Sequence, residues 1–88
     1  MTKETVKEIL NDIAESNSFN HDLSITVILK DHTMRSASCQ CMDTFDQKFA
    51  IIGNSLRLSI NDYYDIYIDI DAIQSISDET FNEDDNEN

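Results

Sequence analysis

The residue types that most often carry chemistry are few in this chain and are scattered along it. Cys39 and Cys41 are separated by one residue, and the two histidines are His21 and His32. Zinc sites usually have two to four residues between paired cysteines, whereas only Gln40 lies between these two. Nothing in the sequence places either histidine beside the cysteines. We therefore interpret the cysteines as thiols of the packed interior, with metal binding as the alternative.

The sequence lacks the groupings that are typical of hydrolytic and nucleotide-binding sites. It has no HExxH motif and no serine–histidine–acid grouping, and its only glycine, Gly53, leaves little flexible backbone to surround a phosphate. A domain of 88 residues also has little room for a deep catalytic cleft. We predict a protein that is not an enzyme and that holds no cofactor.

A row of aspartates interleaved with aromatic and aliphatic residues lies between positions 62 and 71. Tyr64, Ile66, Ile68 and Ile70 alternate with polar residues, which predicts a half-buried strand from 63 to 71 with one polar side. The polar side and the turn before it supply the candidate partner-binding residues, namely Asp62, Tyr63, Asp65, Tyr67, Asp69 and Asp71.

This row of aspartates has three interpretations. The carboxylates can gather a divalent cation or imitate spaced phosphates, or they can form a solvated face whose charges discourage edge-to-edge aggregation. Tyrosines exposed among acidic groups are common in protein-binding surfaces, because each ring supplies contact area at little entropic cost. If the chain has a functional surface, this face is the best candidate for it.

The whole chain has the same sign of charge as this face. Eighteen Asp and Glu residues against six Lys and Arg give a net charge of −12. Such a charge repels nucleic acid and anionic membranes and favours cationic surfaces. We expect no direct nucleic-acid binding and no membrane association, and we expect a basic protein partner, in particular one that handles nucleic acid.

The sequence also predicts a cytoplasmic location. No apolar run approaches the roughly 20 residues that span a bilayer, and Met1-Thr2-Lys3-Glu4 lacks the basic-then-apolar order of a signal peptide. The two cysteines are too close together for a disulfide that staples a small secreted fold. We expect them to remain reduced.

The elements that must position these residues begin with an amphipathic helix. Between Thr5 and Glu15 the apolar residues recur at helical spacing and form one stripe. Either Thr2 or Thr5, the latter with Glu8 in a capping box, can cap this helix. The stripe consists of Val6, Ile9, Leu10, Ile13 and Ala14.

Strand patterns follow the helix. The alternation of 24–29 ends at a tight turn, Lys30 to Thr33, and the next strand, 34–42, places Ala37, Cys39 and Cys41 on an inward face with Arg35 at its edge. A turn over 43–47 precedes strands at 48–52 and 56–60, which Gly53 joins with positive φ. After the strand at 63–71, a short strand at 73–76 can close the sheet.

The fold class is therefore α+β, with an N-terminal amphipathic helix and a small, strongly bent antiparallel sheet of four to five strands. This sheet either curls into a small barrel or remains a meander with the helix across its open face. Residues 1–76 form a single domain. Residues 77–88 carry six acidic side chains and Phe81 as their only large apolar residue, so we expect a disordered acidic tail.

Two segments resemble the Sm-like fold of RNA-binding ring proteins. Ile25 to Thr33 (ITVILKDHT) is similar to the first strand and hairpin of that family, and Met42 to Ile52 (MDTFDQKFAII) is similar to its bent second strand, Phe-Asp turn and third strand. The resemblance covers residues 25–76 and implies a small bent barrel.

The chain departs from the Sm-like pattern where that family binds RNA. Ala50 stands about where an RNA-contacting Asn is usual, no Arg-Gly or Lys-Gly pair precedes the last strand, and His32 replaces the usual hairpin glycine. The resemblance therefore implies the fold without the uridine-binding site.

Two functional hypotheses follow. In size and charge the chain resembles small phage-encoded inhibitors of the anti-CRISPR and DNA-mimic types, which suggests a module that occupies a basic, nucleic-acid-binding surface of a partner protein. The alternative is an Sm-like structural or regulatory subunit that forms a homo-oligomer through its strand edges, with weak or lost RNA binding.

Overall fold

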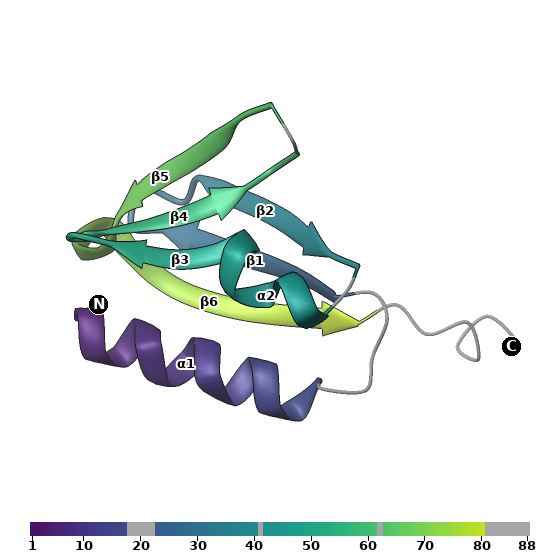
Figure 1. Cartoon of the computed structure of the whole chain (residues 1–88). Helices are drawn as coiled ribbons and strands as arrows, with labels where there is room; N and C mark the ends of the chain where they lie inside the picture. The colour runs from purple at the N-terminus through teal and green to yellow at the C-terminus, as the bar shows by residue number, and fades with distance from the viewer. Residues whose placement is uncertain (18–22, 41, 62, 81–88) are drawn as a thin grey trace, which may run out of the picture.

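A computed structural model describes residues 1–17, 23–40, 42–61 and 63–80 of the chain. The first helix is α1 (Lys3–Ser16) and the first strand is β1 (Leu23–Leu29). The elements after them are β2 (Met34–Cys39), the 3₁₀ turn η1 (Met42–Thr44), α2 (Phe45–Lys48), β3 (Phe49–Ile52), β4 (Ser55–Ser59), β5 (Asp65–Asp69), the 3₁₀ turn η2 (Ile70–Ala72) and β6 (Ile73–Thr80) (Figure 1).

Helix α1 starts earlier than the apolar stripe alone indicates. The hydroxyl of Thr2 accepts a hydrogen bond from the backbone N–H of Thr5 at 3.1 Å. Thr2 is therefore the N-cap, as one of the two predicted alternatives has it, and the helix gains most of a turn. Its buried residues are Val6, Leu10 and Ile13, so the predicted apolar face is confirmed.

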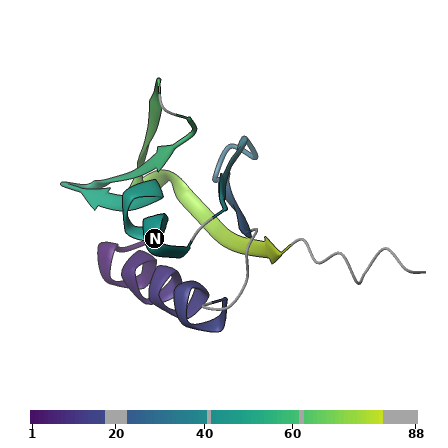
Figure 2. The same ribbon diagram turned by 45° about the vertical axis from the view of Figure 1, so that its right-hand side comes forward.

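The strands form two antiparallel sheets of three strands each. Their orders are β2-β1-β6 and β3-β4-β5, and α1 contacts β3 and β6. Figure 2 shows the β4–β5 hairpin and the β1–β2 hairpin as two separate arms, and β2 still contacts β4. The predicted α+β class is thus confirmed, but the prediction of one bent sheet of four to five strands is wrong, and the described strands do not close into a barrel.

The short helix α2 explains why the strands divide into two sheets. Phe45 and Phe49 lie four residues apart, which brings both rings to one side of a helical turn, and both are buried. Their ring centroids are 5.0 Å apart. Residues 43–47, predicted as a simple turn, therefore form most of η1 and most of α2, and they separate β2 from β3.

The predicted strand from 63 to 71 is shorter than its alternation suggests. β5 ends at Asp69, whose side chain accepts a hydrogen bond from the backbone N–H of Asp71 at 3.1 Å and so caps η2. This turn leads the chain from the sheet β3-β4-β5 into β6, which belongs to the other sheet.

Strand β6 crosses the predicted domain boundary after residue 76. It pairs with β1 from Leu29↔Ile73 to Leu23↔Thr80, so residues 77–80 belong to the sheet. Ser77 and Glu79 are exposed, and backbone pairing lets an edge strand include such polar residues. The rest of the predicted tail, 81–88, lies outside the described residues.

One hydrophobic core joins α1, α2 and both sheets. The inward residues of β1 are Leu23, Ile25 and Val27, and those of β4 are Leu56 and Leu58, all five almost completely buried. The other members of this core are Val6, Leu10, Ile13, Ala37, Cys39, Phe45, Phe49, Ile68, Ile70 and Ile73.

Both tight turns lie where the sequence predicts them. Gly53 has φ of 61°, which favours a residue without a side chain. His32 also has positive φ, 74°. Its N–H bonds the Leu29 carbonyl at 2.9 Å, and the Leu29 N–H bonds the Thr33 carbonyl at 2.8 Å. This is the three-residue hairpin loop whose last position prefers glycine.

Candidate partner-binding surface

The outward face of β5 presents the predicted acidic and aromatic side chains. Asp65, Tyr67 and Asp69 are exposed, Tyr67 by 58%. Ile66 is partly buried and Ile68 is buried. The predicted alternation is confirmed within β5, and it places two carboxylates and one phenol ring in a single row.

Neighbouring strands and turns hold the three carboxylates of this surface. The Ser59 hydroxyl on β4 donates to Asp65 at 2.8 Å. The side-chain amide of Asn54 lies between the other two, and its Nδ2 is 3.3 Å from Asp69 Oδ1 and 3.4 Å from Asp71 Oδ2. Neutral donors thus fix the positions of these acids and leave their charge in place.

Aromatic side chains extend the acidic row beyond the start of β5. Tyr63 is 92% exposed, as predicted. Tyr64 was predicted to face inward, and this is wrong because the residue precedes β5 and is 54% exposed. The side chain of Asn61 accepts from the backbone N–H groups of Tyr63 and Tyr64 at 2.7 and 3.2 Å, which shapes the turn. Asp62 lies outside the described residues.

Arg57 is part of this surface and was not predicted. It lies on β4 in register with Ala50 on β3 and Tyr67 on β5. Its guanidinium Nη2 donates to the Gln47 carbonyl at 3.0 Å, so it turns toward α2 rather than toward the aspartates. The sequence pattern could have placed Arg57 on the outward face of this strand, because Arg57 lies between the buried residues Leu56 and Leu58.

The described part of the chain does not bring potential metal ligands together. No three His, Cys, Asp or Glu side chains among those residues are grouped as a metal site requires. Cys39 is buried, with 1% exposure, and its sulfur lies 3.7 Å from the Thr44 hydroxyl. His32 is exposed at the β1–β2 turn. Cys41 and His21 lie outside the described residues.

Among the residues that the structure describes, the carboxyl of Asp31 has a shifted pKa. Hydrogen bonds from the side chain and then the backbone of Thr33 hold the pKa of Asp31 below its ordinary value. The backbone N–H of Thr33 lies 2.9 Å from Asp31 Oδ1. This bond shapes the β1–β2 turn, and Asp31 lies on a different element from the acidic row.

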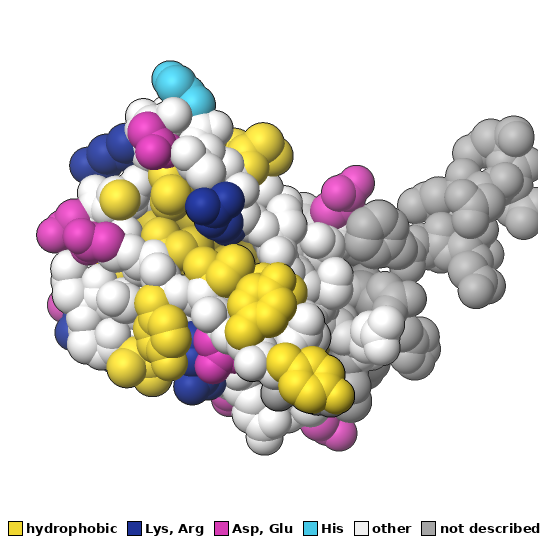
Figure 3. Space-filling view, turned by 90° about the horizontal axis from the view of Figure 1, so that it is seen from above, with side chains coloured by type: hydrophobic (Ala, Val, Ile, Leu, Met, Phe, Trp, Pro, Cys, Tyr) yellow, Lys and Arg dark blue, Asp and Glu magenta, His cyan; other side chains and the backbone are white. Residues whose placement is uncertain are grey.

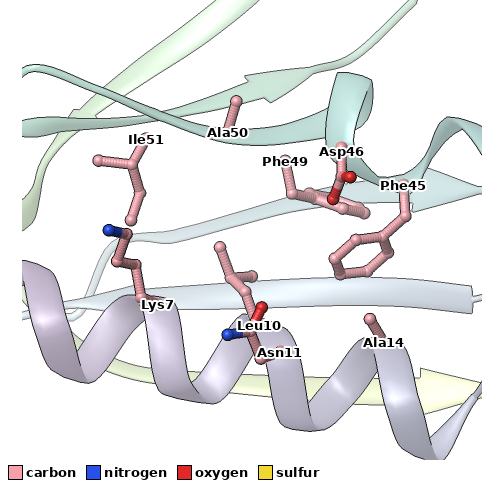
Figure 4. A pocket seen from close by; sticks show the side chains of 9 residues that line it. All are labelled: Lys7, Leu10, Asn11, Ala14, Phe45, Asp46, Phe49, Ala50 and Ile51. Carbon is pink, nitrogen blue, oxygen red and sulfur yellow. The ribbon is translucent and has the colours of Figure 1, made fainter.

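A groove of about 310 Å³ lies between α1 and the α2–β3 segment. Figure 4 shows Leu10, Phe45 and Phe49 forming its apolar wall. Lys7, Asn11 and Asp46 add polar groups of both charges around it, and Ala14, Ala50 and Ile51 complete the lining. Its mixed charge distinguishes the groove from the acidic surface on β5.

Hydrophobic side chains form a band across the face on which β2 and β5 lie (Figure 3). Among the described residues, the most exposed large hydrophobic side chains include Met34 of β2, Tyr67 of β5 and the tyrosines before β5. The candidate surface therefore combines exposed apolar area with the acidic row, which is the composition expected of an interface.

Comparison of the chain with protein-family models, curated proteins and solved structures finds no match. No helix in the described ranges is long and apolar enough to cross a membrane.

Proposed function

We propose that this protein is a non-enzymatic, cytoplasmic binding module that occupies a basic, nucleic-acid-binding surface of a partner protein. The exposed row of Asp65, Tyr67 and Asp69 on one face of β5, with Asp71 held beside Asp69 by Asn54, carries this proposal. Fixed carboxylates attract Lys and Arg side chains, and the tyrosines supply contact area between them.

The charge of the whole chain supports the same role. A net charge of −12 steers the molecule toward cationic surfaces and speeds association at low ionic strength. In size and charge the chain resembles small phage-encoded inhibitors of the anti-CRISPR and DNA-mimic types. We infer competition with nucleic acid for the partner's surface.

The test is capture of partners from host-cell lysate at low and high salt. The wild type is compared with a variant in which Asp65, Asp69 and Asp71 are all changed to Asn. We expect salt-sensitive capture of a nucleic-acid-handling protein that the variant loses, because the charged pairs are screened or removed.

The matched control removes the same number of charges elsewhere. Glu8→Gln, Asp12→Asn and Glu15→Gln lie on the exposed side of α1, and we expect this variant to retain the partner. Equal loss of the partner in both variants would mean that only net charge matters and would contradict a site on β5.

The unpaired strand edges favour a second candidate, an Sm-like subunit that assembles with copies of itself. β2 and β5 are outer strands with no strand partner on one side among the described residues. Light scattering decides this alternative, because it requires a defined oligomer.

A further inference from the structure

The free edge of β5 has a definite pattern of backbone groups. At the two ends of the β4–β5 ladder, the Ile60 N–H bonds the Tyr64 carbonyl at 3.2 Å and the Ile70 N–H bonds the Asn54 carbonyl at 3.0 Å. Hydrogen-bonded pairs alternate with non-bonded pairs in an antiparallel ladder. Counted inward from the two ends, the hydrogen-bonded pairs of this ladder are Leu58↔Ile66 and Leu56↔Ile68.

The backbone groups of the intervening residues therefore point away from β4. Asp65 and Tyr67 pair with Ser59 and Arg57 at non-bonded positions, so their N–H and carbonyl groups face the free edge. β5 is one of the two outer strands of its sheet, and no described strand pairs with its other edge. The edge thus offers donors and acceptors in the order that an added strand requires.

Helix α1 packs on one side of the two sheets. It contacts β3 and β6, which are the outer strands on its side. β2 and β5 are the outer strands on the opposite side, where Figure 3 shows the hydrophobic band. A strand added to β5 would place every second side chain beside Ile66 and Ile68, on the face of the sheet that packs against the core.

Charge determines which strand can bind there. The other side chains of an added strand would lie opposite Asp65, Tyr67 and Asp69, where Lys and Arg are favourable. A second copy of β5, paired antiparallel about Tyr67, would place Asp65 against Asp69. Like charges directly opposite one another destabilise a sheet, so this edge disfavours its own copy.

We propose that the β5 edge binds an extended segment of a basic protein, in which Lys or Arg alternates with apolar residues, as a fourth strand of the sheet β3-β4-β5. This inference rests on the proposed function and adds the geometry by which the partner is recognised.

The test uses a labelled peptide in which lysine and valine alternate, with fluorescence anisotropy as the readout. Tyr67→Pro removes the central free N–H without breaking a β4–β5 bond, a position at which an edge strand tolerates proline. Tyr67→Ala removes the same ring and keeps the N–H. We expect the proline variant to bind at least about fivefold more weakly than the alanine variant, as loss of one hydrogen bond implies.

Probe variants test the same contact without changing the protein. A peptide with lysines and valines in separate blocks should bind more weakly than the alternating one. Methylation of the alternate peptide amides that would face β5 should abolish binding to the wild type, because it removes the donors. This second measurement also decides the question if Tyr67→Pro fails to fold, which circular dichroism checks.

Three outcomes would overturn strand addition. The proline and alanine variants could bind equally, the methylated peptide could bind as well as its parent, or the wild type could form a dimer that the peptide does not disrupt. If binding is nevertheless lost when Asp65, Asp69 and Asp71 are changed to Asn, the proposed function stands and only the strand geometry falls.

Discussion

His32 is the residue whose backbone is under the clearest strain. Its φ of 74° lies in the left-handed region, at a loop position that favours glycine. The side chain is exposed, so it gains little from packing in return. The left-handed backbone of His32 therefore reduces the stability of the β1–β2 hairpin.

His32→Gly should therefore stabilise the protein by about 0.5–1 kcal/mol, the relief of strain less the greater chain entropy of glycine. Urea unfolding measures the change in free energy. His32→Ala is the control, since it removes the imidazole and keeps Cβ. Equal stabilisation by alanine would show that the imidazole, rather than the backbone, is unfavourable.

Single residues also show why the inward position of Tyr64 was predicted wrongly. Tyr64 fits the alternation with Ile66 and Ile68 but lies in the turn that Asn61 shapes, so it is exposed. Alternation identifies the sides of a strand but does not determine where the strand begins. Asp65, Tyr67 and Asp69 lie within β5, and there the predicted outward orientation is confirmed.

At the scale of elements, Asn17 joins the end of α1 to β6. It is 4% exposed, and its Nδ2 donates to the Ile13 carbonyl at 2.7 Å and to Asp78 Oδ2 at 3.1 Å. The first bond satisfies a carbonyl at the helix end, and the second crosses to the other element. Asn17 thus sets how α1 lies along the sheet.

We expect Asn17→Ala to reduce the free energy of unfolding by about 1–2 kcal/mol, because it removes two hydrogen bonds at a buried site. Asn11→Ala, an exposed change on the same helix, should be nearly neutral. A double-mutant cycle with Asp78→Ala isolates the contact between α1 and β6. A coupling energy near zero would show that this contact does not orient the helix.

Local signals predicted α1, the turn at Gly53 and the sides of β5, because spacing and backbone preference act over a few residues. The sequence did not predict α2, because the segment that contains Phe45 and Phe49 is also compatible with a turn followed by a strand. The division into two sheets depends on pairs such as Leu23↔Thr80, which no local pattern specifies.

At the scale of the whole molecule, β6 is essential to the sheet that contains β1. β1 is the central strand of β2-β1-β6, and residues 77–80 pair with its first half. The acidic composition from residue 77 onward does not reveal this pairing. The free energy of the sheet therefore depends on residues that composition assigns to a tail.

A chain that ends at residue 76 should be at least about 2 kcal/mol less stable than one that ends at residue 80, because it loses the backbone bonds of several pairs with β1. Chemical unfolding of both truncated chains, beside the full chain, measures this difference. Equal stability of the two truncated chains would show that β6 contributes nothing beyond Ile76.

The position of β1 also affects how the chain folds during synthesis. Its sequence, LSITVIL, is apolar and rich in β-branched residues, and it can pair early only with β2, the next strand along the chain. One edge of β1 stays open until residues 73–80 have left the ribosome, because its other neighbour, β6, lies more than forty residues further along the chain. An open edge on such a segment favours aggregation, so yield in the cell should depend on how quickly β6 pairs with it.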